Sequence, residues 1–329
     1  MSRIARRGML LGKFLPPHRG HVYMTDFAAG LVEELDVVVC SLPCEPIPGP
    51  LRHRWMQELA PRATVHHLTE DLPQEPAEHP DFWRLWEDAL RRLLPVEPEL
   101  VFASEAYGSP LAELFGARFV PVDPEREIMP ISGTAVRARP LTHWRLLPAP
   151  VRPYFLKRVC VFGPESTGKT TLTRELAEAF ETVAVPEYAR TWLEAHGRDP
   201  EPADMPMIAA GRLASQQALE RRANRVLICD TDALTTRIWS EELFGEVAPE
   251  VAALVGRETF DLTLLTDIDV PFEPDPIRYF PNRRERFMTR CREALEEAGR
   301  RYTVIRGSRE ERRREARRAV ESLLADSAE

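Results

Sequence analysis

Two phosphate-binding patterns of different design stand 151 residues apart in this chain. The stricter one, Gly163-Pro-Glu-Ser-Thr-Gly-Lys169-Thr170, matches G-x-x-x-x-G-K-[ST] at every fixed position. It follows an apolar run at residues 159–162, typical of a buried strand, and precedes residues 172–180, whose apolar side chains recur at helical spacing. A strand, a loop with glycines and a helix in this order predict a P-loop, in which backbone N–H groups at the start of the helix surround phosphates.

The P-loop residues have distinct expected roles. We expect the Lys169 ammonium to contact the β- and γ-phosphates of ATP and the Thr170 hydroxyl to bind Mg²⁺. Arg278 lies in an arginine-bearing segment before a later helix. This segment is predicted to close over the phosphates, although a solvated arginine cluster fits it equally well. The predicted ATP-binding set in this half of the chain is Gly163, Glu165, Ser166, Thr167, Gly168, Lys169, Thr170, Thr171 and Arg278.

Lysine is rare in this chain, which makes its positions informative. Only three of the 44 basic residues are lysines, namely Lys13, Lys157 and Lys169, and two of these lie inside the phosphate-binding patterns. A compact ammonium is not equivalent to a planar guanidinium where a phosphate is approached end-on. We therefore predict that Lys13 and Lys169 contact phosphates, with helix initiation as the alternative role of Lys13. Lys157 is predicted to lie on the surface.

Length and composition exclude several classes of protein. With 329 residues, of which 43% are hydrophobic and 29% charged, the chain is long enough for two cores. The net charge of −8 argues against a nucleic-acid surface, and glutamates interrupt the arginine-rich residues 309–318, which indicates a solvated helix. No apolar stretch approaches the roughly 20 residues of a membrane span, and the N-terminus lacks a signal-peptide core. We expect a cytosolic protein that binds neither nucleic acid nor membranes.

The five cysteines do not form a recognisable metal site. Cys40, Cys160 and Cys229 lie in apolar, strand-like runs, where a thiol acts as a small hydrophobic group. Cys40 and Cys44 are close in sequence, but neither a second pair nor a suitably spaced histidine completes a zinc site. We predict that the cysteines are structural.

Strand-like and helix-like patterns alternate in both halves of the chain. This alternation predicts an α/β protein with two doubly wound parallel-sheet domains. A proline-rich connection at residues 140–153 separates them, so we place the domains at 1–150 and 151–329, with the second core beginning near residue 157. The predicted strands are 9–12, 36–41, 63–68, 100–104 and 118–122 in the first domain, and 158–162, 182–185, 226–230, 262–266 and 302–306 in the second.

The other phosphate-binding pattern occupies residues 12–21, between the first predicted strand and a helix predicted at 22–34. His18 and His21 stand at the start of that helix, where both could donate N–H groups to anionic oxygens. Gly20 between them would let a nucleotide approach the backbone closely. A capping or core histidine pair is the structural alternative. A metal pair is not indicated, because no third ligand is evident.

This stretch resembles the HxGH motif of the nucleotidylyltransferase superfamily, and residues 131–137 (ISGTAVR) resemble the second signature of that superfamily, [ST]-[SG]-T-x-x-R. The resemblance implies a Rossmann-like domain whose histidines stabilise charge on an α-phosphate during in-line attack, without a covalent intermediate. Ser132 and Thr134 would begin a helix that meets the β- and γ-phosphates, and Arg137 would neutralise them. The implied ATP-binding set is Gly12, Lys13, Phe14, His18, Gly20, His21, Ser132, Thr134 and Arg137.

Three further stretches resemble the NadR family, which joins a nicotinamide mononucleotide adenylyltransferase to a ribosylnicotinamide kinase. They are residues 52–56 (RHRWM), 82–86 (FWRLW) and 103–105 (ASE), and the resemblance extends from Met9 to about residue 325. Some members carry an N-terminal helix-turn-helix domain, which we do not expect before Gly12. A cationic nicotinamide ring favours an aromatic face and a nearby acid. The candidate substrate residues are Arg54, Trp83, Trp86 and Glu105, with helix packing in the core as the alternative for either tryptophan.

Carboxylates follow two predicted strands of the second domain, at the edge where such sheets bind ligands. Glu187 begins an E-Y-x-R segment, and Asp230 and Asp232 form D-T-D; both segments resemble the kinase half of the NadR family. We predict that Glu187 is the proton acceptor or a ribose ligand and that Asp230 lies on the magnesium side. Asp232 is a weaker substrate candidate, because helix N-capping is its alternative role. Arg190 is a further substrate candidate and Asp275 a weaker one.

The resemblance implies a bifunctional NAD salvage enzyme that uses ATP and Mg²⁺. Its kinase would convert nicotinamide riboside to nicotinamide mononucleotide (NMN), and its adenylyltransferase would convert NMN to NAD and pyrophosphate. A coenzyme A synthase-like protein and a nucleotide-sensing regulator with one inactive site are the alternatives, and formation of a homo-oligomer is left open. The first alternative usually has threonine in place of His18. The predicted catalytic residues are His18, His21, Lys169, Glu187 and Asp230, and the predicted metal ligands are Thr170 and Asp230.

Overall fold

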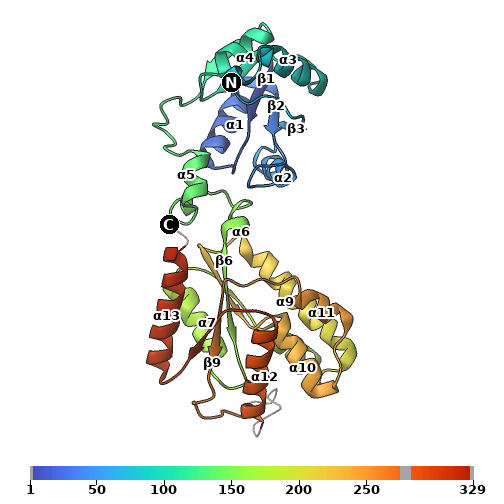
Figure 1. The fold of residues 1–329 in the computed structure, drawn as a ribbon, viewed down its shortest axis with the longest axis vertical. Coiled ribbons are helices and arrows are strands. Elements are labelled where there is room, and N and C mark those ends of the chain that lie inside the picture. Colours follow the sequence, from blue (N-terminus) through green and yellow to red (C-terminus); the bar gives the residue numbers. More distant parts are fainter. Residues whose placement is uncertain (1–2, 275–282, 327–329) are drawn as a thin grey trace. The chain divides into compact units, whose positions relative to one another are not determined.

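The computed structural model describes residues 3–274 and 283–326. Contacts within the chain divide it into two compact units, Met1–Val151 and Arg152–Glu329 (Figure 1). The division falls inside the proline-rich stretch at residues 140–153. Each unit contains its own five-stranded sheet, and the predicted α/β architecture with two parallel sheets is confirmed.

The first unit is built on a sheet with the strand order β3-β2-β1-β4-β5, in which all neighbouring strands are parallel. The chain proceeds from β1 towards one edge and then returns to the other side of β1. The switch point therefore lies between β1 and β4, where a doubly wound sheet binds its ligands beyond the carboxyl ends of the strands. The elements are β1 (Ala5–Gly12), α1 (Arg19–Leu31), β2 (Val32–Cys40), α2 (Gly49–Leu59), β3 (Thr64–Leu68), the 3-10 turn η1 (Pro76–Glu78), α3 (Phe82–Leu93), β4 (Leu100–Ala103), α4 (Gly108–Leu114), β5 (Arg118–Pro121), α5 (Gly133–Ala138) and the 3-10 turn η2 (Trp144–Leu146).

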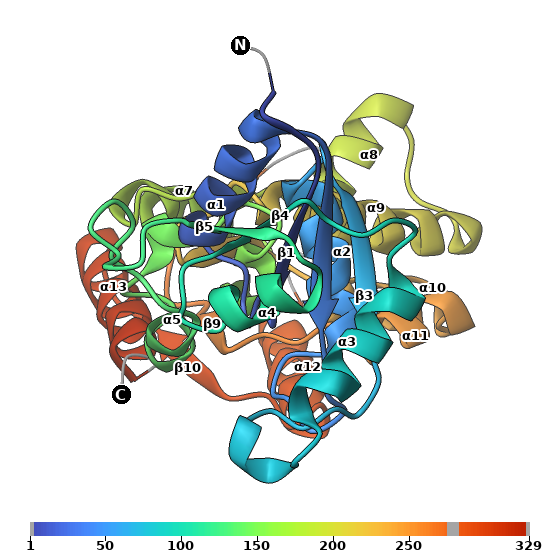
Figure 2. The same ribbon diagram turned by 90° about the horizontal axis from the view of Figure 1, so that it is seen from above.

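Alternate residues of the central strands point to opposite faces, and each face has its own helices. Leu10 of β1 packs in a core with α1 and α2, whereas Met9 packs in a second core with α3 and α4. In Figure 2 the strands β1, β4 and β5 lie between α1 and α4. Because both faces are covered, the strands are continuous apolar runs, as expected for a parallel sheet.

The boundary between α1 and β2 differs from the prediction. The sequence pattern predicted a helix at residues 22–34, but α1 ends at Leu31 and β2 begins at Val32. Val32 pairs with Ala5, and Glu34 pairs with Arg7, in a ladder that starts earlier in β1 than the apolar pattern indicated. Pairing with a partner strand overrides the helical spacing of these residues, because local propensity is a weak determinant beside tertiary contacts.

The second unit repeats this architecture with the strand order β10-β9-β6-β8-β7, again parallel throughout. The strand β6 is central, with β8 and β9 on its two sides. Of the predicted strand at 182–185, only two residues form a ladder. The elements are α6 (Arg152–Phe155), β6 (Lys157–Phe162), α7 (Lys169–Ala179), β7 (Ala184–Val185), α8 (Tyr188–His196), the 3-10 turn η3 (Pro202–Asp204), α9 (Met205–Glu220), β8 (Val226–Asp230), α10 (Ala233–Phe244), α11 (Pro249–Val255), β9 (Leu262–Thr266), α12 (Arg284–Glu297), β10 (Tyr302–Ile305) and α13 (Arg309–Asp326).

Helices cover both faces of this sheet as well (Figure 1). Val159 and Val161 of β6 pack against α7 and α13, whereas Cys160 and Phe162 pack against α10 and α12. A separate apolar cluster joins α8, α9 and α11 beside the sheet. The prediction that α13 is a solvated helix is wrong in part, because Arg312 on this helix is only 6% exposed.

The five cysteines carry free thiols, and all of them except Cys44 are buried. Burial raises the pKa of Cys40, Cys229 and Cys291 to about 12.

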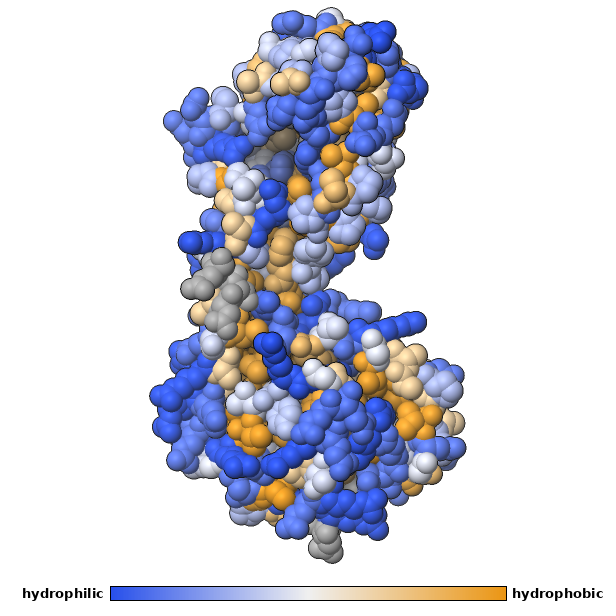
Figure 3. Space-filling view, viewed as in Figure 1, coloured by the Kyte–Doolittle hydropathy of each residue, from blue (hydrophilic) through white to orange (hydrophobic). Residues whose placement is uncertain are grey.

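Hydrophobic residues form small scattered groups among hydrophilic ones on the face seen in Figure 3. Among the helices in the described part of the chain, none combines the length and the apolar character needed to cross a bilayer.

The packing of β4 generates a stability prediction for the first unit. Phe102 is fully buried, and its ring lies where a side chain at Gly8 would be, 2.7 Å from an added Cβ atom. Phe102→Ala should lower the free energy of unfolding of this unit by about 3–5 kcal/mol, because it leaves a cavity in the centre of the core. Chemical denaturation checks this, with Val96→Ala, 57% exposed, as the control. A loss below about 1 kcal/mol would contradict the packing described.

Candidate functional site

The histidine motif of the first unit connects β1 to α1 at the switch point of the sheet. His18 is the N-cap of α1, and its Nδ1 accepts a hydrogen bond from the Gly20 N–H at 3.2 Å. The His18 N–H in turn donates to Nδ1 of His21 at 3.2 Å, and the two rings stack with centroids 3.8 Å apart. Because each Nδ1 is an acceptor, the proton of each neutral ring resides on Nε2. Both histidines therefore have one N–H group left to donate.

Gly20 is required by the histidine beside it. A Cβ atom at this position would lie 2.9 Å from Cε1 of His18, so any other residue would displace the ring. The sequence had indicated that this glycine admits a nucleotide to the backbone; in the structure it makes room for the N-cap imidazole.

Both imidazoles are uncharged near neutral pH. Burial lowers the pKa of His18 to about 4, and the nearby Arg126 guanidinium contributes to the shift. Burial, His18 and Arg126, in that order, hold the pKa of His21 well below its usual value. These rings are thus neutral hydrogen-bond donors, and positive charge at this site comes from other side chains.

A cavity of about 100 Å³ adjoins the two histidines. Five of the predicted site residues line it, namely His18, Gly20, His21, Glu105 and Ser132. Ser104, Asp123 and Arg126 also line it, and the sequence analysis assigned no role to the last two. Arg126 lies in an irregular loop without a recognised motif, so only its position in space identifies it.

Lys13 and Phe14 lie beside the histidine motif. Nζ of Lys13 is 3.2 Å from Glu45, and its side chain is 48% exposed. Glu45 also pairs with Arg52, a fully buried residue that donates to the carbonyl oxygens of Lys13, Cys40 and Ile47. The ring of Phe14 packs edge-on against His21, with centroids 4.9 Å apart.

The second signature forms α5 and the turn before it. Ser132 is the N-cap, and its Oγ accepts from the Ala135 N–H at 3.1 Å. Arg137 donates to the carbonyl oxygen of Leu15 and to the Thr134 hydroxyl, which is 3.1 Å away. This arginine therefore joins α5 to the loop between β1 and α1, and the two signatures that are far apart in the sequence meet here.

Three predicted substrate residues of this unit lie elsewhere. Arg54 is exposed on α2, whereas the neighbouring Arg52 is buried. Trp83 and Trp86 are half-buried on α3 and pack against the core, and Nε1 of Trp86 donates to Pro73 at 2.9 Å. None of the three lines the cavity described above. Both tryptophans thus show the helix packing that the sequence left open as the alternative, and their substrate role stays a prediction.

The P-loop of the second unit is closed against β9. Gly163 has a φ of 139°, and a Cβ atom there would lie 2.8 Å from the Thr266 carbonyl oxygen, so this position needs glycine. The Thr167 hydroxyl is 2.7 Å from that of Thr266 and donates to Pro164 at 2.8 Å. Lys169 donates to the same carbonyl, at 2.8 Å. The Lys169 ammonium thus contacts the P-loop, the loop at which its motif predicts phosphate binding.

Asp230 and Thr170 meet at the carboxyl ends of β8 and β6. The Thr170 hydroxyl donates to Oδ2 of Asp230 at 2.6 Å, whereas the buried Oδ1 has no hydrogen-bond partner. Burial raises the pKa of Asp230 to about 6, and the Glu187 carboxylate contributes to the increase. An unpaired carboxylate oxygen in such a position is a free ligand for a cation. No group of three or more His, Cys, Asp or Glu side chains within the described ranges could hold a metal by itself.

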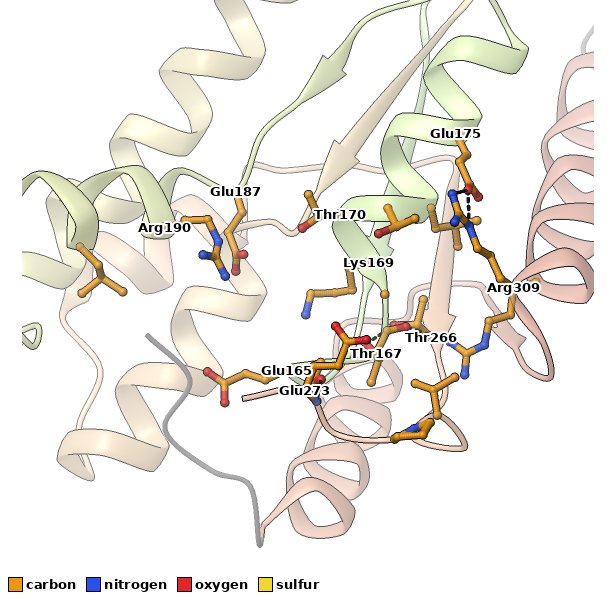
Figure 4. Close-up of a pocket in the computed structure, with 18 residues that line it drawn as sticks. Glu165, Thr167, Lys169, Thr170, Glu175, Glu187, Arg190, Thr266, Glu273 and Arg309 are labelled. Atoms are coloured by element: carbon orange, nitrogen blue, oxygen red, sulfur yellow. Dashed lines mark hydrogen bonds and ion pairs between the residues drawn. The ribbon is translucent and has the colours of Figure 1, made fainter. Parts of the chain in front are cut away.

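A cavity of about 500 Å³ extends over the P-loop. In Figure 4, Glu187 and Arg190 lie across it from Lys169 and Thr170, and Arg309 pairs with Glu175 at another side. Glu187 is the N-terminal neighbour of α8, so β7 and α8 together position it. The predicted residues that line the cavity are Glu165, Ser166, Thr167, Gly168, Lys169, Thr170, Thr171, Glu187 and Arg190.

Both carboxylate oxygens of Asp232 are engaged within the fold. One carboxylate oxygen accepts from the N–H and hydroxyl groups of Thr235 at the start of α10, and the other pairs with Arg300. Neither Asp232 nor Asp230 lines the P-loop cavity, but Asp230 is hydrogen-bonded to Thr170, which does. Helix N-capping, the alternative named from the sequence, explains Asp232. Arg278 and Asp275 lie outside the described residues.

Arg312 is a site residue that sequence reasoning missed. Its guanidinium donates to the carbonyl oxygens of Thr167, Asp267 and Gly307 at 2.9 Å each, and it pairs with Asp269. It therefore fixes the P-loop to the ends of β9 and β10. Nothing in its local sequence distinguishes it from the exposed arginines of the same helix.

Comparison with known proteins gives one family match for part of the chain and two solved structures for nearly all of it. Residues 158–312 match a family described as an AAA domain. A crystal structure of NadR protein in complex with NAD and AMP-PNP superposes with a TM-score of 0.81 over 98% of both chains, at 24% identity. A NadR structure in complex with NR covers 99% of this chain and 98% of the other, with a TM-score of 0.80 at 23% identity. These likenesses establish the fold of both units.

Two curated relatives share more of the sequence. The protein named "Trifunctional NAD biosynthesis/regulator protein NadR" of Salmonella typhimurium is 30% identical over 295 residues, which is 82% of this chain and 71% of that one. Its namesake in Escherichia coli is 30% identical over 316 residues. Because that alignment covers 88% of this chain and 76% of the Escherichia coli protein, the chain belongs to the NadR family.

Proposed function

We propose that this protein is a bifunctional enzyme of NAD salvage. The second unit phosphorylates nicotinamide riboside with ATP to give NMN, and the first unit adenylylates NMN with ATP to give NAD and pyrophosphate. The observation that carries the proposal is that a member of the NadR family has two separate cavities, one beside the histidine motif and one over the P-loop. The names of solved relatives, which mention NAD, AMP-PNP and NR, support the choice of substrates.

In the proposed adenylyl transfer, a phosphate oxygen of NMN attacks the α-phosphorus of ATP, and the bond to the bridging oxygen of pyrophosphate breaks. The Nε2–H groups of His18 and His21 donate to the oxygens of the α-phosphate, where negative charge develops. Their neutrality supports this role, because a neutral imidazole with its proton on Nε2 requires no counter-ion and keeps that N–H group for a ligand. Lys13 and Arg137 supply positive charge to the departing pyrophosphate.

In the proposed kinase reaction, the 5′-hydroxyl oxygen of the riboside attacks the γ-phosphorus of ATP and ADP leaves. Glu187 accepts the hydroxyl proton, and Lys169 exchanges its hydrogen bond to Pro164 for phosphate oxygens. The position of Glu187 across the cavity from Lys169 supports this division of roles (Figure 4).

We further propose that Asp230 and Thr170 hold Mg²⁺ in the kinase site. Support comes from the unpaired, buried Oδ1 of Asp230 and from the hydroxyl next to it. Two protein ligands are typical of magnesium, which takes its remaining ligands from phosphates and water. When bound, the ion neutralises phosphate charge.

The first prediction separates the two activities. Lys169→Ala should abolish phosphorylation of nicotinamide riboside but leave NAD formation from NMN intact, because the two sites lie in separate cores. Coupled assays of both activities on the purified full chain measure this. Lys157→Ala is the matched control, since Lys157 pairs with Asp261 away from the loop. Loss of both activities in a folded Lys169 variant would refute two independent sites.

The second prediction concerns the neutral imidazoles. His21→Ala should slow adenylyl transfer about a hundredfold by removing a preorganised donor, with exposed His79→Ala as the control. In the wild type, the pH profile of the His18 and His21 ring signals in NMR spectra should show no titration between pH 6 and 8. The reason is that the pKa of His18 is about 4 and that of His21 is well below its usual value. A histidine pKa near 6.5 in this profile would contradict the burial argument.

The third prediction concerns Asp230, whose pKa is about 6 in the folded protein and about 3.8 in the unfolded chain. The protonated carboxyl is favoured in the folded state, so this contribution to stability is lost as the pH rises from about 3.8 to about 6. Asp230→Asn should stabilise the second unit by about 2–3 kcal/mol at pH 7.5, and the gain should vanish near pH 4. The same variant should lose kinase activity. Thermal unfolding against pH and magnesium-dependent kinase assays test the two effects. A variant that is less stable at pH 7.5, or that keeps wild-type kinase activity, would contradict this role.

A further inference from the structure

The loop between β5 and α5 carries Arg126 on a backbone that hydrogen bonds hold in place. Asp123 accepts the N–H groups of Ile128 at 3.1 Å and Met129 at 2.9 Å with its two carboxylate oxygens, and its carbonyl accepts the Arg126 N–H at 3.0 Å. Asp123 and Arg126 both have left-handed backbone conformations, with φ of 48° and 54°. Non-glycine residues keep such conformations only where their surroundings enforce them. The hydrogen bonds around Asp123 provide that enforcement and fix the backbone from which the Arg126 side chain extends.

Arg126 brings positive charge to the cavity beside the histidines. Among the described residues that line this cavity, it is the only arginine or lysine. Its charge also contributes to the low pKa of both His18 and His21. The cavity is thus lined by two neutral donors and one guanidinium.

The Arg126 guanidinium pairs with the Glu105 carboxylate, which a ligand can replace. Arg126 donates to Glu105 at 3.0 Å, and the two side chains are 38% and 58% exposed. Exposed ion pairs of this kind contribute little to stability, so a ligand can separate them at small cost. Asp123, by contrast, is part of the loop framework, because its two carboxylate oxygens accept the N–H groups of Ile128 and Met129. Glu105 follows β4 at the switch point, where a ligand of this sheet is expected.

We propose that the Arg126–Glu105 pair binds the mononucleotide, which carries opposite charges of its own. The 5′-phosphate replaces Glu105 on the Arg126 guanidinium, and the pyridinium ring lies next to the released Glu105 carboxylate. This assignment rests on the proposed adenylyl transfer and adds a specificity rule to it. Nicotinate mononucleotide carries a further carboxylate on its ring, which Glu105 repels, so the site prefers the amide over the acid form.

The experiment compares Arg126→Met, Arg126→Lys and Glu105→Gln with the wild type in the full chain. Arg84→Met is the matched control, because this arginine is 69% exposed and its nearest acidic partner, Asp81, lies outside the cavity. Initial rates are measured with NMN or nicotinate mononucleotide varied at saturating Mg-ATP, and with Mg-ATP varied at saturating NMN. Thermal unfolding of each variant reports whether the first unit has folded, because the kinase activity of the separate second unit cannot show this.

Arg126→Met should raise the KM for NMN about thirtyfold or more and change the KM for ATP less than about threefold, with Arg126→Lys between. Glu105→Gln should shift the ratio of kcat/KM for the amide over the acid form by about tenfold towards the acid form. An equal change in both KM values for Arg126→Met, or an unchanged ratio for Glu105→Gln, would overturn the assignment while leaving the proposed function standing. Wild-type protein that makes no dinucleotide from either mononucleotide would overturn the proposed function itself.

Discussion

In each unit, a buried guanidinium holds together the loops that form the candidate site. Arg52 donates to carbonyl groups in the loop after β1, at the end of β2 and before α2. Arg312 does the same for the P-loop and for the segments after β9 and β10. Main-chain carbonyls at the edge of a parallel sheet lack ladder partners, and a buried one without a hydrogen bond is costly. A planar group with five donors in a fixed geometry can satisfy several loops at once better than the three donors of a lysine.

The two candidate sites differ in the kind of ionisable group that they bury: the first buries bases and the second buries an acid. The first contains buried bases, His18 and His21, which burial keeps neutral. The second contains a buried acid, Asp230, whose pKa burial raises and whose Oδ1 has no hydrogen-bond partner. In both cases desolvation disfavours the charged form, and the opposite charge of a ligand would offset this cost. Each site therefore favours a ligand of the charge that phosphoryl or adenylyl transfer involves, an anion at the first site and a cation at the second.

At the edge of each sheet where the candidate site lies, several residues affect both the fold and the site. Gly20 makes room for the N-cap imidazole, and Gly163 makes room for the backbone of β9, so neither can take a side chain without moving a site residue. Asp232 caps α10 and pairs with Arg300, which leaves the neighbouring Asp230 as the carboxylate that faces Thr170. The two aspartates of one D-T-D segment thus have separate tasks, one in the fold and one at the site.

The sequence by itself determined the parallel α/β architecture, because continuous apolar runs alternating with helical spacing have few other solutions. It also located the motifs around His18 and Lys169, whose chemistry depends on local spacing. Tertiary structure alone decided which polar residues are used: Arg126 and Arg312 look like any surface arginine in the sequence, and Asp232 looks like a ligand. The start of β2 was likewise decided by pairing with β1. Local patterns encode backbone conformation and burial, whereas the partner of a side chain depends on segments that are distant in the chain.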